Sequence, residues 1–164
     1  MREIILIAHN LRSCHNVGSL LRTAEGLGVS KVILSGYTPH PAHANDRRLP
    51  HEAAKITAMI HKTALGAEDM VPWDYHHELP AVIAKLKKNG WTVAAVEQAE
   101  DSKDLPKYHA PEKIAIIVGR EVEGIEKEIL DLCDTTLEIP MFGKKESFNV
   151  VQAAAMVLYH CRFF

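Results

Sequence analysis

Hydrophobic residues along this chain fall into two kinds of pattern. Four continuous runs are typical of strands buried on both faces of a sheet, and they span residues 3–8, 31–35, 91–96 and 114–118. The last strand is predicted at residues 135–139, where Leu137 and Ile139 are apolar. A shorter strand is predicted near Met70 and Val71. Elsewhere, hydrophobic residues recur every three or four positions, which is the spacing of a helix face. This spacing predicts helices over residues 17–27, 51–65, 80–88, 125–132 and 149–162.

Because strands and helices alternate, the sequence predicts an α/β fold with a mostly parallel sheet and helices on both of its faces. Ligands of such sheets bind beyond the carboxyl ends of the strands. Three polar loops occupy that position, residues 10–16, 119–124 and 140–147. We therefore expect the functional residues in these loops.

Two further loops are long and polar. Residues 98–111 are predicted to form a surface excursion. Residues 36–50 contain three prolines and the cations Arg47 and Arg48, and loops of this length in a compact domain are usually functional or disordered. This second loop is either a solvated connection or a basic lip that contacts phosphate, and the sequence leaves both interpretations open.

The segment from Ile139 to Leu158 joins the last predicted strand to the last predicted helix. Pro140 has no N–H and ends regular strand pairing. Ser147 or Asn149 stands where the helix needs an N-cap. The helix beyond is apolar on nearly every face, which favours a buried helix. A polar loop between a buried strand and a buried helix can hold a ligand, although most such loops are ordinary connections.

Composition narrows the classes of function. A chain of 164 residues is long enough for one domain with a substantial core. Its formal net charge of −2 provides no general attraction for nucleic acid, so any such site must be a local patch. No apolar run is long enough to span a membrane, and three cysteines without paired spacing are typical of a reducing cytoplasm. The ten histidines show no metal-ligand spacing, so we expect no metal site.

The glycines and glutamates after residue 118 restrict the kind of ligand. The chain contains neither the glycine–lysine signature of a P-loop nor the glycine triplet of a Rossmann dinucleotide site. Instead, two glycines bracket residues 119–124, and four carboxylates lie in or after this turn, those of Glu121, Glu123, Glu126 and Glu128. These carboxylates suit the start of a helix and disfavour a phosphate ligand. A cationic ligand with a sulfonium and an amino group would tolerate them.

Three sequence blocks together resemble the SpoU-type RNA ribose 2′-O-methyltransferases of the SPOUT, or α/β-knot, class. Residues 10–24 follow the pattern N-x-R-S-x-x-N-V-G-S-x-x-R-T-A, residues 119–124 the pattern G-x-E-x-x-G, and residues 139–150 the pattern I-P-M-x-G-x-x-x-S-F-N-V. Residues 48–73 are also similar to the middle segment of that family. Each block alone is weakly specific, but the similarity covers nearly the whole chain in the family's order.

The resemblance implies a fold, a cofactor and partners. It implies a single methyltransferase domain over residues 1–164, without an appended RNA-binding domain, in which the last strand and helix thread a loop and form a trefoil knot. It implies S-adenosylmethionine as the cofactor, bound in a bent shape, and transfer of its methyl group to a ribose 2′-hydroxyl of tRNA or rRNA. It also implies a cytoplasmic homodimer with the C-terminal helix in the interface, which agrees with the apolar character of residues 149–162.

The resemblance also assigns roles to individual residues. The polar residues expected around the reacting ribose are Arg22, Asn16, Glu121, Ser147 and Asn149. The residues expected at the cofactor are Gly119, Ile139, Met141 and Phe148. Those expected to contact RNA are Arg12, Arg47 and Arg48.

Arg22 matches the family's catalytic arginine. Because arginine side chains stay charged in proteins, two explanations of its role remain open. Either its environment makes Arg22 transiently neutral, or it binds the adjacent phosphate and a phosphate oxygen takes the proton. Taken alone, Arg22 is more simply a solvated charge on a helix, and Asn16, Ser147 and Asn149 can be helix caps.

Two positions depart from the family pattern, and two other functions remain as alternatives. Phe148 stands where leucine is usual, and Val151 stands where serine is frequent; Phe148 can still form the wall of an adenine pocket. A base-nitrogen methyltransferase of the same class usually lacks the pairing of Asn16 with Arg22 six residues later. A catalytically inactive RNA-binding protein on the same fold should have lost some of the five polar residues, and this chain keeps them all.

Overall fold

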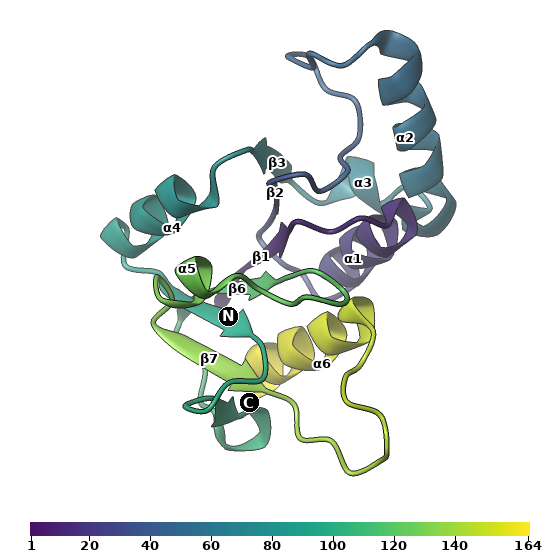
Figure 1. Ribbon diagram of the computed structural model, residues 1–164. Coiled ribbons are helices and arrows are strands. Elements are labelled where there is room, and N and C mark those ends of the chain that lie inside the picture. Colours follow the sequence, from purple (N-terminus) through teal and green to yellow (C-terminus); the bar gives the residue numbers. More distant parts are fainter.

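A seven-stranded sheet runs through the computed structural model, which describes residues 1–164 (Figure 1). In chain order the strands are β1 Glu3–His9, β2 Lys31–Ser35, β3 Trp73–His76, β4 Thr92–Val96, β5 Lys103–Asp104, β6 Lys113–Val118 and β7 Thr135–Glu138. Their order across the sheet is β3-β2-β1-β6-β4-β7-β5, and every neighbouring pair is parallel. The predicted parallel sheet is therefore confirmed.

Helices cover both faces of this sheet, as predicted (Figure 1). They are α1 Cys14–Gly26, α2 Pro50–Ala64, α3 Ala67–Met70, α4 Leu79–Lys88, α5 Lys127–Leu130 and α6 Val150–Phe163, with one 3₁₀ turn, η1, at Leu105–Lys107. Alternate side chains of β1 point to opposite faces: Ile4 and Leu6 pack with α1 and α6, whereas Ile5 and Ile7 pack with α4. None of the helices has the length and apolar character needed to cross a membrane.

Three predicted elements differ from the structure. Met70 ends the short helix α3, and the strand expected at Met70 and Val71 begins only at Trp73. Residues 98–111 form more than a surface excursion, because β5 lies within them at the sheet edge and Leu105 is buried. A two-residue strand is too short to show an alternating pattern. The helix expected over residues 125–132 contracts to the single turn of α5.

The close approach of α1 to α2 depends on Gly18. A Cβ at this position would lie 2.2 Å from the carbonyl oxygen of Ile60, a distance that real contacts do not show. The Thr63 hydroxyl also donates a hydrogen bond to the carbonyl oxygen of His15 at 2.8 Å. These contacts hold α2, which extends beyond the rest of the molecule, against α1 (Figure 1).

Strand β7 lies between β4 and β5, although both of those strands precede it in the chain. Residues 97–102, which connect β4 with β5, therefore cross the carboxyl end of β7. Two hydrogen bonds fix this crossing: the Glu97 N–H donates to the Leu137 carbonyl at 3.1 Å, and the Ser102 hydroxyl donates to Glu138 Oε2 at 2.6 Å. The trefoil knot implied by the resemblance stays a prediction.

Hydrogen bonds of polar side chains connect the carboxyl ends of β1 and β2. His9 is buried, and its Nδ1 lies 2.9 Å from Ser35 Oγ while its Nε2 lies 3.1 Å from Asn10 Nδ2. This geometry fits a neutral ring whose Nδ1–H donates to Ser35 and whose Nε2 accepts from Asn10. Asn10 has a left-handed φ of 55° and accepts a hydrogen bond from the Tyr37 N–H at 3.1 Å. Residue 36 must be glycine, because a Cβ there would lie 1.8 Å from Asn10 Oδ1.

The neutral form of His9 predicts a loss of stability in weak acid. Burial lowers the pKa of His9 below its ordinary value of 6.5; the charge of Glu126 partly opposes this, and that of Arg120 adds to it. A proton on Nε2 would face the Asn10 amide, which is itself a donor, as well as Glu126 Oε2 at 3.4 Å, whose charge is the one that partly opposes the shift. The unfolded chain therefore binds the proton more readily, so the stabilisation is complete above about pH 6.5 and is lost as the pH falls toward the lowered pKa.

We expect the free energy of unfolding in urea to decrease between pH 7 and pH 5.5, and to decrease less in His9→Gln. The comparison with the variant is needed because burial also lowers the pKa of His40, which acts in the same direction. Glu126, whose pKa is lowered from 4.5, loses its contribution only in stronger acid. Equal pH dependence in the two proteins would show that His9 is not responsible.

Candidate active site

A cavity of about 280 Å³ lies at the carboxyl ends of β4, β6 and β7. It is lined by residues 96–98, 118–124 and 146–148 together with Leu137, Ile139, Met141, Val150 and Ala153. Two of the three loops predicted to hold functional residues, 119–124 and 140–147, meet in this cavity. The position is the one at which parallel sheets commonly bind ligands.

The floor of the cavity is a tight turn after β6. A Cβ on Gly119 would lie 2.4 Å from Ile125 Cγ1, and a Cβ on Gly124, which has a φ of 71°, would lie 2.2 Å from Glu97 Oε2. The Glu97 carboxylate accepts hydrogen bonds from the Ile125 N–H at 3.0 Å and the Gln98 N–H at 2.9 Å. Glycines at both ends therefore allow the turn to close on Ile125 and Glu97 without a steric clash.

Sequence reasoning missed Glu97. Its side chain lines the cavity and fixes the turn 28 residues later in the chain. The available signal was its position directly after β4, because a polar residue at the carboxyl end of a parallel strand is a candidate by location alone.

The wall of the cavity contains the residues predicted to contact the cofactor. Ile139, Met141 and Phe148 all line it, together with the turn that starts at Gly119. Phe148 is 39% exposed. Its aromatic ring therefore forms part of the cavity surface at the position where the family usually has leucine. Val151 instead packs against the main hydrophobic core. Of the two departures from the family pattern, only Phe148 alters the cavity.

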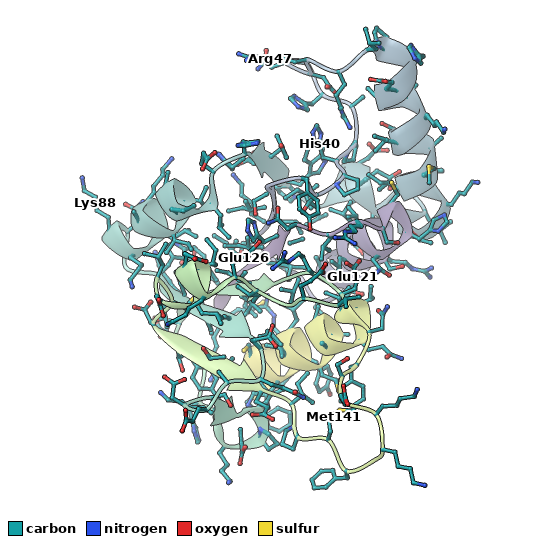
Figure 2. The ribbon with its side chains drawn as sticks, in the orientation of Figure 1. His40, Arg47, Lys88, Glu121, Glu126 and Met141 are labelled. Atoms are coloured by element: carbon teal, nitrogen blue, oxygen red, sulfur yellow. The ribbon has the colours of Figure 1, made fainter.

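Three side-chain pairs join the first sequence block to residues 121–126, which include the end of the second block. The pairs are Asn10 Nδ2 with Glu126 Oε1 at 2.7 Å, Arg12 with Glu123 Oε1 at 3.1 Å, and Asn16 Nδ2 with Glu121 Oε1 at 2.9 Å. Figure 2 shows Glu121 and Glu126 on the segment between β6 and α5. Since Glu121 and Glu123 also line the cavity, residues 10–16 lie at its rim. The structure thus brings the predicted residues Asn16 and Glu121 into direct contact.

Ser147 and Asn149 have different local roles. The Asn149 side chain accepts a hydrogen bond from the Val151 N–H at 2.8 Å and is the N-cap of α6. Ser147 lines the cavity and has no hydrogen-bond partner in the chain, so its hydroxyl is available to a ligand. Ser13, rather than Asn16, is the N-cap of α1, and its hydroxyl accepts from the Asn16 N–H.

Arg22 does not line the cavity. Its side chain is exposed on α1 and makes neither a hydrogen bond nor an ion pair within the chain. The structure therefore leaves its guanidinium free and does not bring it together with Asn16 or Glu121. A free arginine in this place is available to a partner molecule.

The three arginines predicted to contact RNA lie in different settings. Arg47 is exposed on the loop before α2, far from the cavity (Figure 2). Arg12 is exposed but paired with Glu123. Arg48 is partly buried, and its guanidinium donates hydrogen bonds to both carboxylate oxygens of Asp46 and to the carbonyl oxygen of His40. The donors of Arg48 are thus used within the loop.

One group of side chains has the composition of a metal site. Ligand atoms of His40, His43 and Asp46 lie within 4.8 Å of one another. However, Arg48 hydrogen-bonds to both oxygens of Asp46 and holds the pKa of that carboxyl well below its usual range. The guanidinium already supplies the positive charge that this carboxylate needs. The prediction that the protein binds no metal stays a prediction.

Comparison with known proteins identifies relatives over nearly the whole chain. The chain is 32% identical over 155 residues to a putative TrmH family tRNA/rRNA methyltransferase of Staphylococcus aureus, which covers 94% of this chain and 56% of the relative. It is 31% identical over 159 residues to the 23S rRNA (guanosine-2′-O-)-methyltransferase RlmB of Neisseria meningitidis, covering 97% of this chain and 58% of that protein. The chain thus spans just over half the length of these relatives.

Solved structures show the same fold. The AdoMet-bound rRNA methyltransferase from Sinorhizobium meliloti superposes with a TM-score of 0.81 at 20% identity, over 98% of this chain and 56% of the other. The model of the SpoU rRNA Methylase family matches residues 3–159, which include all three sequence blocks. Because this match covers almost the entire chain, the protein belongs to the SpoU rRNA Methylase family.

Proposed function

We propose that the protein uses S-adenosylmethionine to methylate a ribose 2′-hydroxyl of tRNA or rRNA. The observation that carries this proposal is the cavity in which the predicted cofactor residues meet Glu121, with Asn16 bonded to Glu121 at the rim. The relative that acts on the guanosine 2′-oxygen of 23S rRNA supports the ribose as the target.

The lining of the cavity suits a cofactor that combines an apolar ring with positive charge. Ile139, Met141 and Phe148 provide apolar surface for an adenine, and Gly119 also lines the cavity. Carboxylates of Glu97 and Glu121 lie at the cavity and favour a cation. When bound, S-adenosylmethionine supplies the methyl group from a sulfonium centre.

The residues at the rim orient the attacking oxygen. Glu121 accepts a hydrogen bond from Asn16 Nδ2–H and thereby fixes the amide, which leaves Asn16 Oδ1 free to accept a hydrogen bond from the ribose hydroxyl. Ser147 offers a second unpaired group at the same cavity. Such contacts hold oxygen and methyl group at the separation of about 3–3.5 Å that transfer requires. Arg22, free and exposed, binds the adjacent RNA phosphate, and an oxygen of that phosphate takes the proton that the ribose hydroxyl loses as its oxygen bonds to the methyl group.

The proposal is tested by mapping ribose methylation in tRNA and rRNA from cells with and without the gene. We expect one position, or a small set, to lose its 2′-O-methyl group and to regain it when the purified protein and S-adenosylmethionine are added. Loss of a base methyl group instead would identify the base-nitrogen alternative. Unchanged RNA, together with no heat on calorimetric titration of the metal-stripped protein with the cofactor, would identify an inactive RNA-binding protein.

The homodimer implied by the resemblance is part of this proposal. Tyr159, Phe163 and Phe164 are between 53% and 64% exposed at the end of α6, and the rings of Tyr159 and Phe163 lie 4.8 Å apart. An aromatic group of this kind favours burial against a second protein surface. Light scattering of the purified chain should give about twice its mass of 18.3 kDa. A monomer at micromolar concentration would contradict the dimer.

We expect Arg22→Ala to lower single-turnover methylation by at least ~10²-fold, as for groups that assist proton transfer, with cofactor affinity unchanged. Arg22→Lys should be nearly as damaged, because a point charge does not replace the guanidinium fork. Lys88→Ala is the matched control, since Lys88 is an exposed, unpaired cation on α4, away from the cavity (Figure 2). Near-normal turnover in Arg22→Ala would remove Arg22 from the catalytic residues.

A further inference from the structure

The loop between β7 and α6 has two parts with different surroundings. Met141, Ser147 and Phe148 line the cavity, whereas the loop tip, residues 142–145, extends away from the body of the protein (Figure 1). Phe142 is 98% exposed. Gln98 Nε2 donates a hydrogen bond of 2.7 Å to the carbonyl oxygen of Glu146, the residue that follows the loop tip. The loop tip is therefore held beside the cavity but left open to solvent.

The folded chain gains almost nothing from the side chains of the loop tip. Phe142 buries almost no surface, so it adds little hydrophobic stabilisation. Lys144 and Lys145 are exposed and form no ion pair, and a Cβ on Gly143 would touch nothing within 4 Å. An unburied aromatic ring next to unpaired lysines is the combination by which proteins hold single-stranded nucleic acid, through stacking and phosphate contacts.

The charges around the cavity disfavour an anionic substrate. Glu97, Glu121, Glu123 and Glu146 all line it, and the whole chain carries a formal charge of −2. The arginines on the same rim are already engaged: Arg12 pairs with Glu123, and Arg120 hydrogen-bonds to the Gly124 carbonyl. Lys144 and Lys145 are the unpaired cations carried by a cavity-lining loop. They can offset the repulsion that the carboxylates exert on phosphate.

We propose that the loop tip, residues 142–145, binds a single-stranded nucleotide beside the ribose that is methylated. Phe142 stacks on its base, and Lys144 and Lys145 contact its phosphates. The inference rests on the proposed function and adds to it: the accepted RNA must present an unpaired nucleotide next to the target. Because Met141 precedes Phe142 directly and lines the cavity, the stacked base lies close to the reacting nucleotide.

The test uses the full chain, S-adenosylmethionine and RNA isolated from cells that lack the gene. Phe142→Ala should raise the KM for RNA by about 5- to 150-fold, the range for loss of one stacked base, with cofactor affinity unchanged. Phe142→Trp should retain activity, whereas Phe142→Leu should behave like the alanine variant because it lacks an aromatic face. Lys144→Ala with Lys145→Ala should weaken RNA binding and reduce its salt dependence.

The control for charge is Lys85→Ala with Lys88→Ala, which removes two exposed, unpaired lysines from α4. An unchanged KM in Phe142→Ala would overturn the inference. So would a loss of cofactor affinity, which would make the loop tip a cover for the cofactor, or a shift to monomers, which would make it a contact between two copies of the chain. If the wild-type chain methylates no ribose, the proposed function fails, and fluorescence anisotropy with the same variants and RNA then decides the loop-tip inference separately.

Discussion

The parallel pairing of β6 with β1 and β4 determines where the functional loops lie. Leu6, Ile116 and Ala94 lie side by side in register and are fully buried, so these central strands cannot slide without exposing the core. Because the strands are parallel, their carboxyl ends form one edge of the sheet. The segments that follow these strands bring Asn16, Glu97 and Gly119 into one neighbourhood, although the three residues are far apart in the chain.

The proposed cofactor and the proposed RNA substrate place opposite electrostatic requirements on this edge of the sheet. A cofactor with a positive centre is favoured by the carboxylates of Glu97 and Glu121, whereas an RNA phosphate is repelled by them. The chain reduces the conflict by pairing: Asn10, Arg12 and Asn16 each donate a hydrogen bond to one carboxylate of residues 121–126. What remains for RNA is the set of cations outside these pairs, including Arg22 and Lys144. Separate groups thus meet the two requirements on neighbouring surfaces.

Strands with long apolar runs could be predicted closely, because burial on both faces leaves a strong signal: β2 has the predicted bounds, Lys31–Ser35. The strands β3 and β5 could not, because Trp73–His76 is only half-buried and Lys103–Asp104 exists only through its pairing with β7. The resemblance identified Asn16 and Glu121 but not the bond between them, which depends on the folded sheet. It likewise could not show that Val151 faces the core, or that the donors of Arg48 are used within its own loop.

The place of β7 in the sheet has a consequence for how the protein assembles. This strand enters between β4 and β5, which come earlier in the chain, and it closes pairings such as Ala94 with Thr135 across a wide sequence separation. Contacts of that kind form slowly, because the chain entropy lost in closing the loop precedes any gain from the contact. Residues 139–153, which follow β7, provide one wall of the cavity. A chain in which β7 is not inserted therefore lacks that wall, so the capacity to bind a ligand there requires the pairings of β7 to be complete.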